Sequence, residues 1–277
     1  MQKKVYESKY FDIKSTLECG QVFRFKQYNK GYLVFSGNHC CYAYTDGSST
    51  YLESENIDYF NNYFDLDNDY ERFVLSAEKE GVDILTTSAN LGKGIRILNQ
   101  DIEETLFSFI ISQNNHIPRI KAIIERLCEN LGQERLAFGQ KYYTFPSAEI
   151  IASKDKSFYT SIGLGYRDAY MVEVASKIVN GFSLESLRQL STVDLKKNLL
   201  KLKGVGPKVA DCVTLFGFHR FDSFPVDTWI DKVYRENFKG TITDRKLITE
   251  YFLNRFGDRS GIYQQYLFYY KRTLEEK

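Results

Sequence analysis

The sequence predicts an α+β protein, with an antiparallel β-sheet domain in its N-terminal part and a mostly α-helical region after it. Short aromatic and β-branched segments alternate with turn residues up to about residue 65. From residue 101 onward, apolar residues recur at helical spacing instead. We place the change near residue 98, so the predicted domains are residues 1–97 and 98–277.

The strands of the first domain are predicted from hairpin signals. Turn residues at 28–31 and at Asp46-Gly47 separate segments that suit a half-buried sheet. The predicted strands are residues 21–25, 31–36, 40–44 and 50–52. We expect one antiparallel sheet that is covered by helix.

The helices of the second region follow from apolar periodicity, as in Ile102, Leu106, Phe109 and Ile110. A polar loop is expected around Gly139. The predicted helices are residues 101–113, 119–131, 169–180, 195–202, 207–216, 227–238 and 261–273. A further helix is predicted to begin at residue 147.

Composition bounds the function without identifying it. A chain of 277 residues that is 43% hydrophobic has enough material for a folded core. The net charge is only +1, so a nucleic-acid-binding surface would have to come from local clustering of basic residues.

The cysteines and the N-terminus indicate a cellular location. The five cysteines form neither a CxxC pair nor a zinc spacing, which is typical of a reducing compartment. The first residues contain no apolar signal core, and no apolar run approaches the length of a membrane span. We therefore expect an intracellular protein of the cytoplasm or nucleoid, without a metal site, a cofactor or a membrane partner. Nothing signals oligomerisation, and we expect a monomer.

A glycine-rich turn joins two of the predicted helices and consists of Lys203, Gly204, Val205 and Gly206. The glycines permit a tight hairpin, and Pro207 suits the first turn of the next helix. Free backbone N–H groups in such a hairpin, with the helix N-terminus, can hold a phosphate. On the glycine pattern alone, an ordinary turn between helices is an equally good interpretation.

Lys208 and Asp227 are the candidate catalytic residues. The positive end of the helix dipole disfavours an ammonium group at Lys208, and a neutral amine is a competent nucleophile. Cys212 lies one helical turn further along the same face. Taken alone, Lys208 would be a solvated surface lysine and Asp227 a helix N-cap. The catalytic interpretation depends on their combination with the hairpin.

Residues 202–233 resemble the helix–hairpin–helix motif of the base-excision DNA glycosylase superfamily. With the helix that precedes the hairpin, the motif spans about residues 195–233. Further segments are similar to the 8-oxoguanine DNA glycosylase family, and the resemblance spans residues 10–272. These segments are CGQVFRF at 19–25, FSFIISQNNHIPRI at 107–120, LGYR at 164–167 and GIYQQYLF at 261–268. The iron–sulfur glycosylases fit less well because no cysteine cluster follows the motif, and the alkylation-repair members fit less well because Lys208 is present.

The resemblance implies a bifunctional DNA glycosylase and abasic-site lyase that acts on double-stranded DNA containing 8-oxoguanine. The damaged nucleotide is flipped into a pocket. Lys208 then displaces the base from the sugar and forms a Schiff base, which permits β-elimination. Asp227 either stabilises the developing positive charge or helps to activate the amine.

The same resemblance implies the residues of the lesion pocket. Phe268 and Cys212 would lie against the two faces of the base, and Gln264 would bind its Watson–Crick edge. The carbonyl of Gly20 would accept a hydrogen bond from N7–H of 8-oxoguanine. Undamaged guanine carries an acceptor at N7, so it would meet a repulsion there instead.

Other matched residues would contact the opposite strand and the backbone. Asn114, Arg119 and Arg167 match positions that read the orphaned cytosine, and Tyr166 matches the wedge that fills the vacated stack. We therefore expect a preference for cytosine opposite the lesion. Trp229 stands where relatives have a histidine near a phosphate, and its indole N–H could still donate. His116 replaces a common asparagine.

Two alternatives remain open at this point. The chain could be a glycosylase for another damaged base, or a helix–hairpin–helix protein that binds DNA without catalysis. Borohydride trapping of a covalent complex on an 8-oxoguanine duplex would separate the three interpretations.

Overall fold

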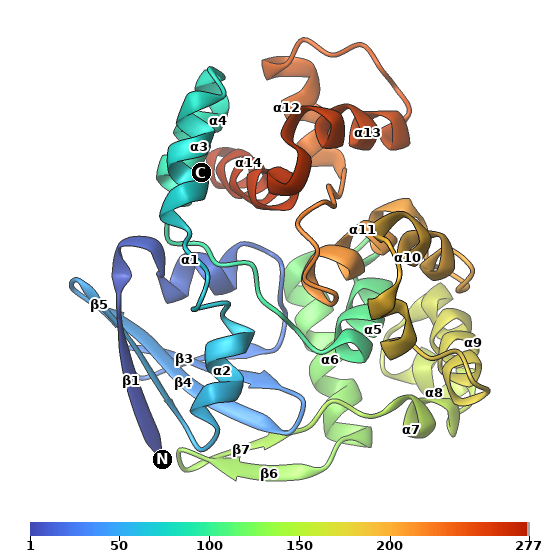
Figure 1. The fold of residues 1–277 in the computed structure, drawn as a ribbon. Coiled ribbons are helices and arrows are strands. Elements are labelled where there is room, and N and C mark those ends of the chain that lie inside the picture. The colour runs from blue at the N-terminus through green and yellow to red at the C-terminus, as the bar shows by residue number, and fades with distance from the viewer. Residues whose placement is uncertain (276–277) are drawn as a thin grey trace.

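The computed structural model describes residues 1–275 and confirms the predicted α+β fold (Figure 1). Five strands near the N-terminus form one antiparallel sheet in the order β1-β5-β4-β3-β2. The strands are β1 (Gln2–Glu7), β2 (Phe25–Tyr28), β3 (Gly31–Ser36), β4 (His39–Asp46) and β5 (Ser49–Ser54).

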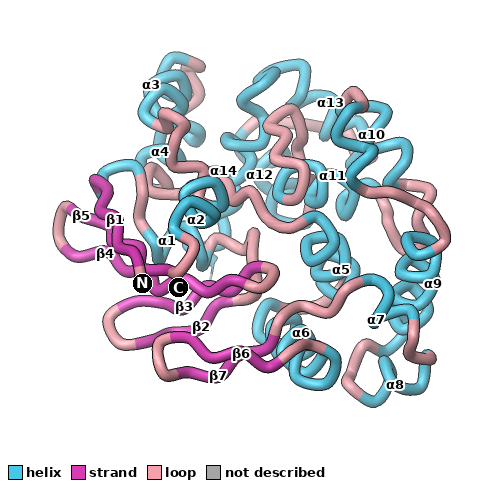
Figure 2. Tube along the Cα trace, turned by 60° about the horizontal axis from the view of Figure 1, so that its bottom comes forward, coloured by secondary structure: helices cyan, strands magenta, loops and turns pink. Residues whose placement is uncertain are grey.

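Both faces of this sheet are buried. One face carries Val34, Cys41 and Leu52 and packs against α1 (Ile13–Glu18) and α2 (Ile57–Tyr63). The other face carries a second set of side chains: Leu33, Phe35, Cys40, Tyr42 and Tyr44. A hairpin of β6 (Glu134–Ala137) and β7 (Gln140–Tyr143) packs against them through Tyr142 and Phe138. Figure 2 shows this hairpin beside the sheet.

Helices form the rest of the molecule around one large hydrophobic cluster. They are α3 (Glu71–Lys79), α4 (Asp83–Leu91), α5 (Ile102–Ser112), α6 (Ile117–Leu131), α7 (Ala148–Ala152), α8 (Lys156–Ser161), α9 (Asp168–Val179), α10 (Thr192–Leu199), α11 (Pro207–Phe216), α12 (Thr228–Asn237), α13 (Arg245–Phe256) and α14 (Ser260–Glu275). The C-terminal helix α14 lies against α4 and α12, so the end of the chain returns to the N-terminal part (Figure 1).

Three local predictions differ from the structure in extent or type. Residues 21–24 are not a strand, because the side chain of Gln21 is fully buried in hydrogen bonds to backbone groups of distant segments. The expected polar loop around Gly139 is the turn of the β6–β7 hairpin. The helix predicted at 195–202 begins earlier, because Ser191 caps α10 by accepting a hydrogen bond from Asp194 N at 3.2 Å.

The segment after α1 is tied firmly to the helical region. Arg24 pairs with Glu104 of α5 at 3.0 Å, and both side chains are buried. The amide of Gln21 donates to the carbonyl of Arg96 at 2.7 Å, and Gln100 donates to the carbonyl of Gln21 at 2.8 Å. These contacts fix the backbone around residue 20 against the core of the helices. The domain boundary near residue 98 stays a prediction.

None of the helices in the described part of the chain combines the length and the hydropathy that a bilayer crossing requires.

Candidate active site

The hairpin between α10 and α11 is present, but only Gly204 of its two glycines has a positive φ, since Gly206 has φ −87°. Gly204 has φ +78°, and a Cβ there would lie 2.4 Å from the ring of Tyr170, so only glycine fits. Val205 N donates to the carbonyl of Leu202 at 3.1 Å and closes the turn. Pro207 occupies the first turn of α11, where its missing N–H costs no hydrogen bond.

Lys208 therefore lies in the first turn of α11. Its side chain is half-buried, and Nζ lies 5.1 Å from the ring centroid of Phe109 on α5. The thiol of Cys212, one turn further on, is buried. Burial raises the pKa of Cys212 to about 11, although the charge of Lys208 acts in the opposite direction. At neutral pH the thiol is therefore protonated, which suits a pocket wall better than a nucleophile.

Asp227 is the N-cap of α12. Its Oδ1 accepts hydrogen bonds from Trp229 N at 3.0 Å and from Ile230 N at 2.9 Å. Burial raises the pKa of Asp227, while these two N–H groups and the charge of Lys208 partly oppose the increase. Asp227 is therefore both a structural cap and a carboxylate within electrostatic reach of Lys208.

A small pocket brings the predicted catalytic and lesion-binding residues together from separate parts of the chain. Its lining residues are Gly20, Phe109, Lys208, Cys212, Phe216, Pro225, Asp227, Gln264, Gln265 and Phe268. The cavity measures about 50 Å³. The small size of this cavity implies that its lining side chains move apart when a purine enters.

Gln264 is buried on the pocket side of α14. Its Nε2 donates to the carbonyl of Pro225 at 3.2 Å. Its Oε1 is buried and has no hydrogen-bond partner in residues 1–275. An orphaned buried acceptor is costly, so this atom is well suited to accept a hydrogen bond from a bound base.

Gly20 lines the same pocket. Its φ is +88°, a conformation that residues with a Cβ rarely adopt. A Cβ there would lie 3.1 Å from the Phe268 ring and 3.0 Å from Nη1 of Arg272. Phe268 and Gly20 are thus in close contact across the pocket, although 248 residues separate them along the chain.

The residues expected to face the opposite strand form a separate group. Tyr166 is 52% exposed, and Asn114 Nδ2 donates to its hydroxyl at 3.3 Å. Arg119 is exposed as well. Arg167 is buried and donates to the carbonyls of Gln113 at 2.9 Å and Leu164 at 3.1 Å. In this structure Arg167 therefore holds the loop that presents Asn114.

The expected backbone-contacting residues flank the catalytic pair. Lys203 is exposed and pairs with Glu173 at 2.5 Å. Gly206 is the N-cap of α11 and provides no side chain, so the helix N-terminus stays open. Trp229 is half-buried at the start of α12, with Nζ of Lys232 4.9 Å from its ring centroid.

Four of the ten pocket-lining residues were not predicted as site residues: Phe109, Phe216, Pro225 and Gln265. Phe109 was interpreted only as a core position of α5, yet it lies beneath the Lys208 ammonium. Gln265 is 2% exposed and donates to the carbonyl of Cys19 at 2.8 Å. The sequence feature that could have indicated Gln265 was a second polar residue directly after Gln264 on an otherwise apolar helix face.

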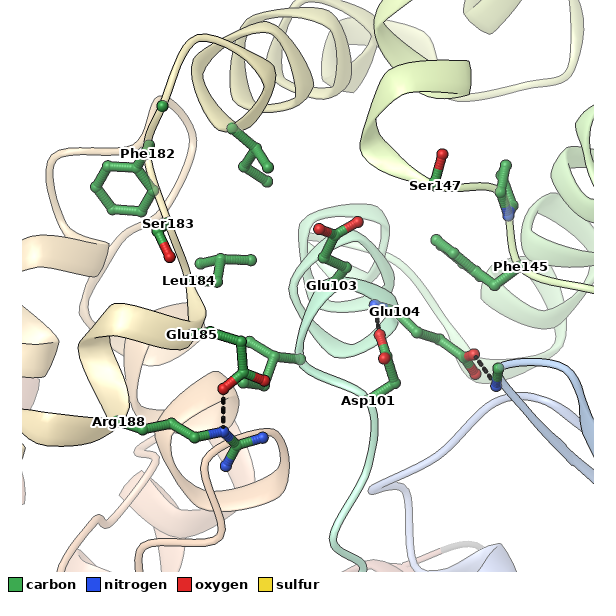
Figure 3. Close-up of a pocket in the computed structure, with 15 residues that line it drawn as sticks. Asp101, Glu103, Glu104, Phe145, Ser147, Phe182, Ser183, Leu184, Glu185 and Arg188 are labelled. Atoms are coloured by element: carbon green, nitrogen blue, oxygen red, sulfur yellow. Dashed lines mark hydrogen bonds and ion pairs between the residues drawn. The ribbon is translucent and has the colours of Figure 1, made fainter. Parts of the chain in front are cut away.

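A larger cavity of about 540 Å³ lies at the N-terminal end of α5, and none of the predicted site residues lines it (Figure 3). Its acidic side chains are already engaged. Glu104 pairs with Arg24, Glu185 pairs with Arg188 at 2.7 Å, and Asp101 caps α5. No group of three metal-ligating side chains occurs within residues 1–275.

Comparison with known proteins places the whole chain among DNA-repair enzymes. Residues 4–106 match the family described as 8-oxoguanine DNA glycosylase, N-terminal domain. The N-glycosylase/DNA lyase of Saccharomyces cerevisiae is 36% identical over 160 residues, which are 53% of this chain. The match spans 43% of the length of that yeast relative.

Two solved structures are similar over nearly the full length. MBOgg1, in complex with a low-affinity DNA ligand, is 35% identical with a TM-score of 0.92, over 99% of this chain and 100% of that one. The 8-oxoguanine glycosylase/lyase of Clostridium acetobutylicum is 31% identical with a TM-score of 0.92, over 99% of both chains. That enzyme is bound to double-stranded DNA with cytosine opposite 8-oxoguanine.

Proposed function

The chain belongs to the 8-oxoguanine DNA glycosylase family, and we propose that it excises 8-oxoguanine from duplex DNA and then nicks the strand at the abasic site. The observation that carries this proposal is the pocket. It unites an amine at a helix start, a half-buried carboxylate, and base-binding groups from both ends of the chain. A protein that only binds DNA would not need this combination.

Lys208 is the proposed nucleophile. Its neutral amine attacks C1′ of the flipped nucleotide, the glycosidic bond breaks, and the base leaves with the bonding electrons and takes up a proton. The sugar ring gains positive charge as that bond lengthens. Asp227, held by two backbone N–H groups, supplies a fixed negative charge next to it.

The covalent product then accounts for strand nicking. The amine on C1′ allows the sugar ring to open into a Schiff base, in which nitrogen is doubly bonded to C1′. Loss of a proton from C2′ and departure of the 3′ phosphate complete a β-elimination. Only an amine nucleophile can follow this route, because an ester or ether at C1′ cannot become an imine.

The DNA backbone is proposed to follow the hairpin. The N–H groups at the open start of α11 and the side chain of Lys203 would bind phosphates beside the flipped nucleotide. Trp229 would donate its indole N–H to a neighbouring phosphate at the start of α12.

Recognition of the base is proposed to come from Gly20, Gln264, Cys212 and Phe268. The Gly20 carbonyl accepts from N7–H of the lesion, and the unpartnered Oε1 of Gln264 accepts from its Watson–Crick edge. Phe268 must rotate away from Gly20 to admit the base, and then stacks on the base opposite Cys212. Guanine would place an acceptor against the Gly20 carbonyl and would therefore be rejected.

We propose cytosine as the preferred base opposite the lesion. Tyr166 fills the vacated stack, while Arg119 and the Asn114 loop held by Arg167 face the orphaned base. Arginine and asparagine can both hydrogen-bond to base edges. Excision is measured on four duplexes that differ only in the opposite base. Equal rates on all four would contradict this part of the proposal.

The decisive test of the activity is borohydride trapping. The wild-type chain is incubated with an 8-oxoguanine:cytosine duplex and borohydride, and a covalent protein–DNA adduct is expected. The adduct should disappear in Lys208→Gln, whereas Lys203→Gln should retain it, because the Lys203 side chain pairs with Glu173 and is proposed to contact DNA only at phosphates. An adduct that persists in Lys208→Gln would rule out Lys208 as the nucleophile, and binding without excision would favour a DNA-binding module.

A further inference from the structure

We propose that Gln265 is a positioning residue for base recognition. It anchors the backbone at Cys19 and so fixes the direction of the neighbouring Gly20 carbonyl, which sets the choice of base. This inference rests on the proposed function, because it concerns how the same pocket selects its base. It assigns a role to a side chain that takes no part in the chemical step.

The contact is long-range and buried. Nε2 of Gln265 on α14 donates to the carbonyl of Cys19 at 2.8 Å, across 246 residues of sequence. The side chain is 2% exposed, so water cannot easily replace it as the donor. Arg272, two turns further along α14, donates to the carbonyl of Glu18. The C-terminal helix thus holds two successive carbonyls before Gly20.

The other side of Gly20 is anchored as well. The carbonyl of Gln21 accepts from Gln100 Nε2 at 2.8 Å, and the side chain of Gln21 donates to Arg96. Gly20 therefore lies between two carbonyls that distant amides hold in place. A glycine at φ +88° has no side chain to define its own conformation. Its carbonyl direction must come from these neighbours.

The direction of that carbonyl matters for only one step. Discrimination between 8-oxoguanine and guanine at N7 depends on one acceptor being at hydrogen-bonding distance. Nicking of a preformed abasic site needs Lys208 and Asp227 but no base in the pocket. Loss of the Gln265 anchor should therefore reduce base excision much more than strand nicking.

Gln265→Met tests this, because methionine keeps the length of the side chain and removes the donor. We expect kcat/KM for 8-oxoguanine excision to fall about 10²-fold, the effect of a misplacement of about 1 Å. Nicking of a preformed abasic site opposite cytosine should stay within about 3-fold. Thr273→Val is the matched control on the same helix, since it removes only a hydrogen bond to Tyr269 of that helix. Both of its activities should stay within about 2-fold.

A second variant covers the case in which Gln265→Met does not fold, as judged by circular dichroism. Gln265→Asn keeps an amide but shortens it by one methylene, and the same split between excision and nicking is expected. Equal losses in both activities would show a merely structural role and overturn the inference, as would unchanged excision. A wild-type chain that forms no adduct and excises nothing would instead reject the proposed function.

Discussion

The catalytic corner and the recognition wall of the pocket are built in different ways. The catalytic corner consists of the 203–206 hairpin, Lys208 and Asp227, which lie within 25 residues and depend on two helix starts. The recognition wall consists of Gly20, Gln264 and Phe268, which meet only because α14 returns to the N-terminal part. Local backbone rules produce the first, and the packing of the two chain ends produces the second. Changes in the two regions should therefore separate chemistry from base choice.

Asp227→Asn in the catalytic corner is the strongest test of whether chemistry and base choice can be separated. Asparagine accepts the same hydrogen bonds from Trp229 N and Ile230 N, so the cap of α12 is retained. The negative charge beside the sugar is lost, and we expect excision and abasic-site nicking both to fall about 10²–10³-fold. Single-turnover rates on the two substrates measure this effect.

Asp227→Ala serves as the control, because it removes the cap together with the charge. It should lower the free energy of unfolding by about 1 kcal/mol, whereas Asp227→Asn should not lower it. Chemical denaturation distinguishes the two variants. If Asp227→Asn kept the wild-type rates, Asp227 would be a helix cap only.

Gly20→Ala is the corresponding change in the recognition wall. The new Cβ would lie 3.1 Å from the Phe268 ring on a backbone with φ +88°, so the carbonyl and the ring must both shift. We expect 8-oxoguanine excision to fall about 10-fold or more. Nicking of an abasic site should change by less than about 3-fold. Loss of both activities to the same extent would mean that the wall and the corner are not separable.

The catalytic corner could be predicted from the sequence because its determinants are local. Gly204 suits a positive φ, Pro207 suits the first turn of a helix, and Asp227 precedes a helical pattern. The structure has Gly204 at positive φ, Pro207 in the first turn of α11 and Asp227 as the N-cap of α12. The helix over 207–216 was predicted with the observed bounds. These features depend on a few neighbouring residues and on backbone sterics.

The recognition wall could not be predicted from local sequence patterns. Nothing near Gly20 or Gln264 in sequence indicates that they line one pocket, and only family resemblance connected them. The strand predicted at residues 21–25 was wrong for 21–24 for the same reason, since the conformation of Gln21 is set by Arg96 and Leu98. The anchor from Gln265 to Cys19 is visible only in three dimensions.

The smallest expected effect concerns the cost of keeping Asp227 charged in the catalytic corner. Burial raises the pKa of Asp227 above its ordinary value of 3.8 in the folded protein. The folded state therefore binds this proton more tightly than the unfolded state, and stability is lost as pH rises through the interval between the two pKa values. Asp227→Asn carries no such penalty, because asparagine does not ionise.

The difference in unfolding free energy between Asp227→Asn and the wild type should therefore depend on pH. At pH 7 the variant should be the more stable of the two proteins, and this gain should vanish as pH falls below 3.8. Urea denaturation of both proteins from pH 3 to pH 7 measures it, and other titrating groups cancel in the comparison. A wild type that gains stability relative to the variant as pH rises would show that hydrogen bonds and the Lys208 charge outweigh burial. The catalytic corner would then stabilise its carboxylate at no cost to the fold, in contrast to the orphaned Gln264 acceptor of the recognition wall.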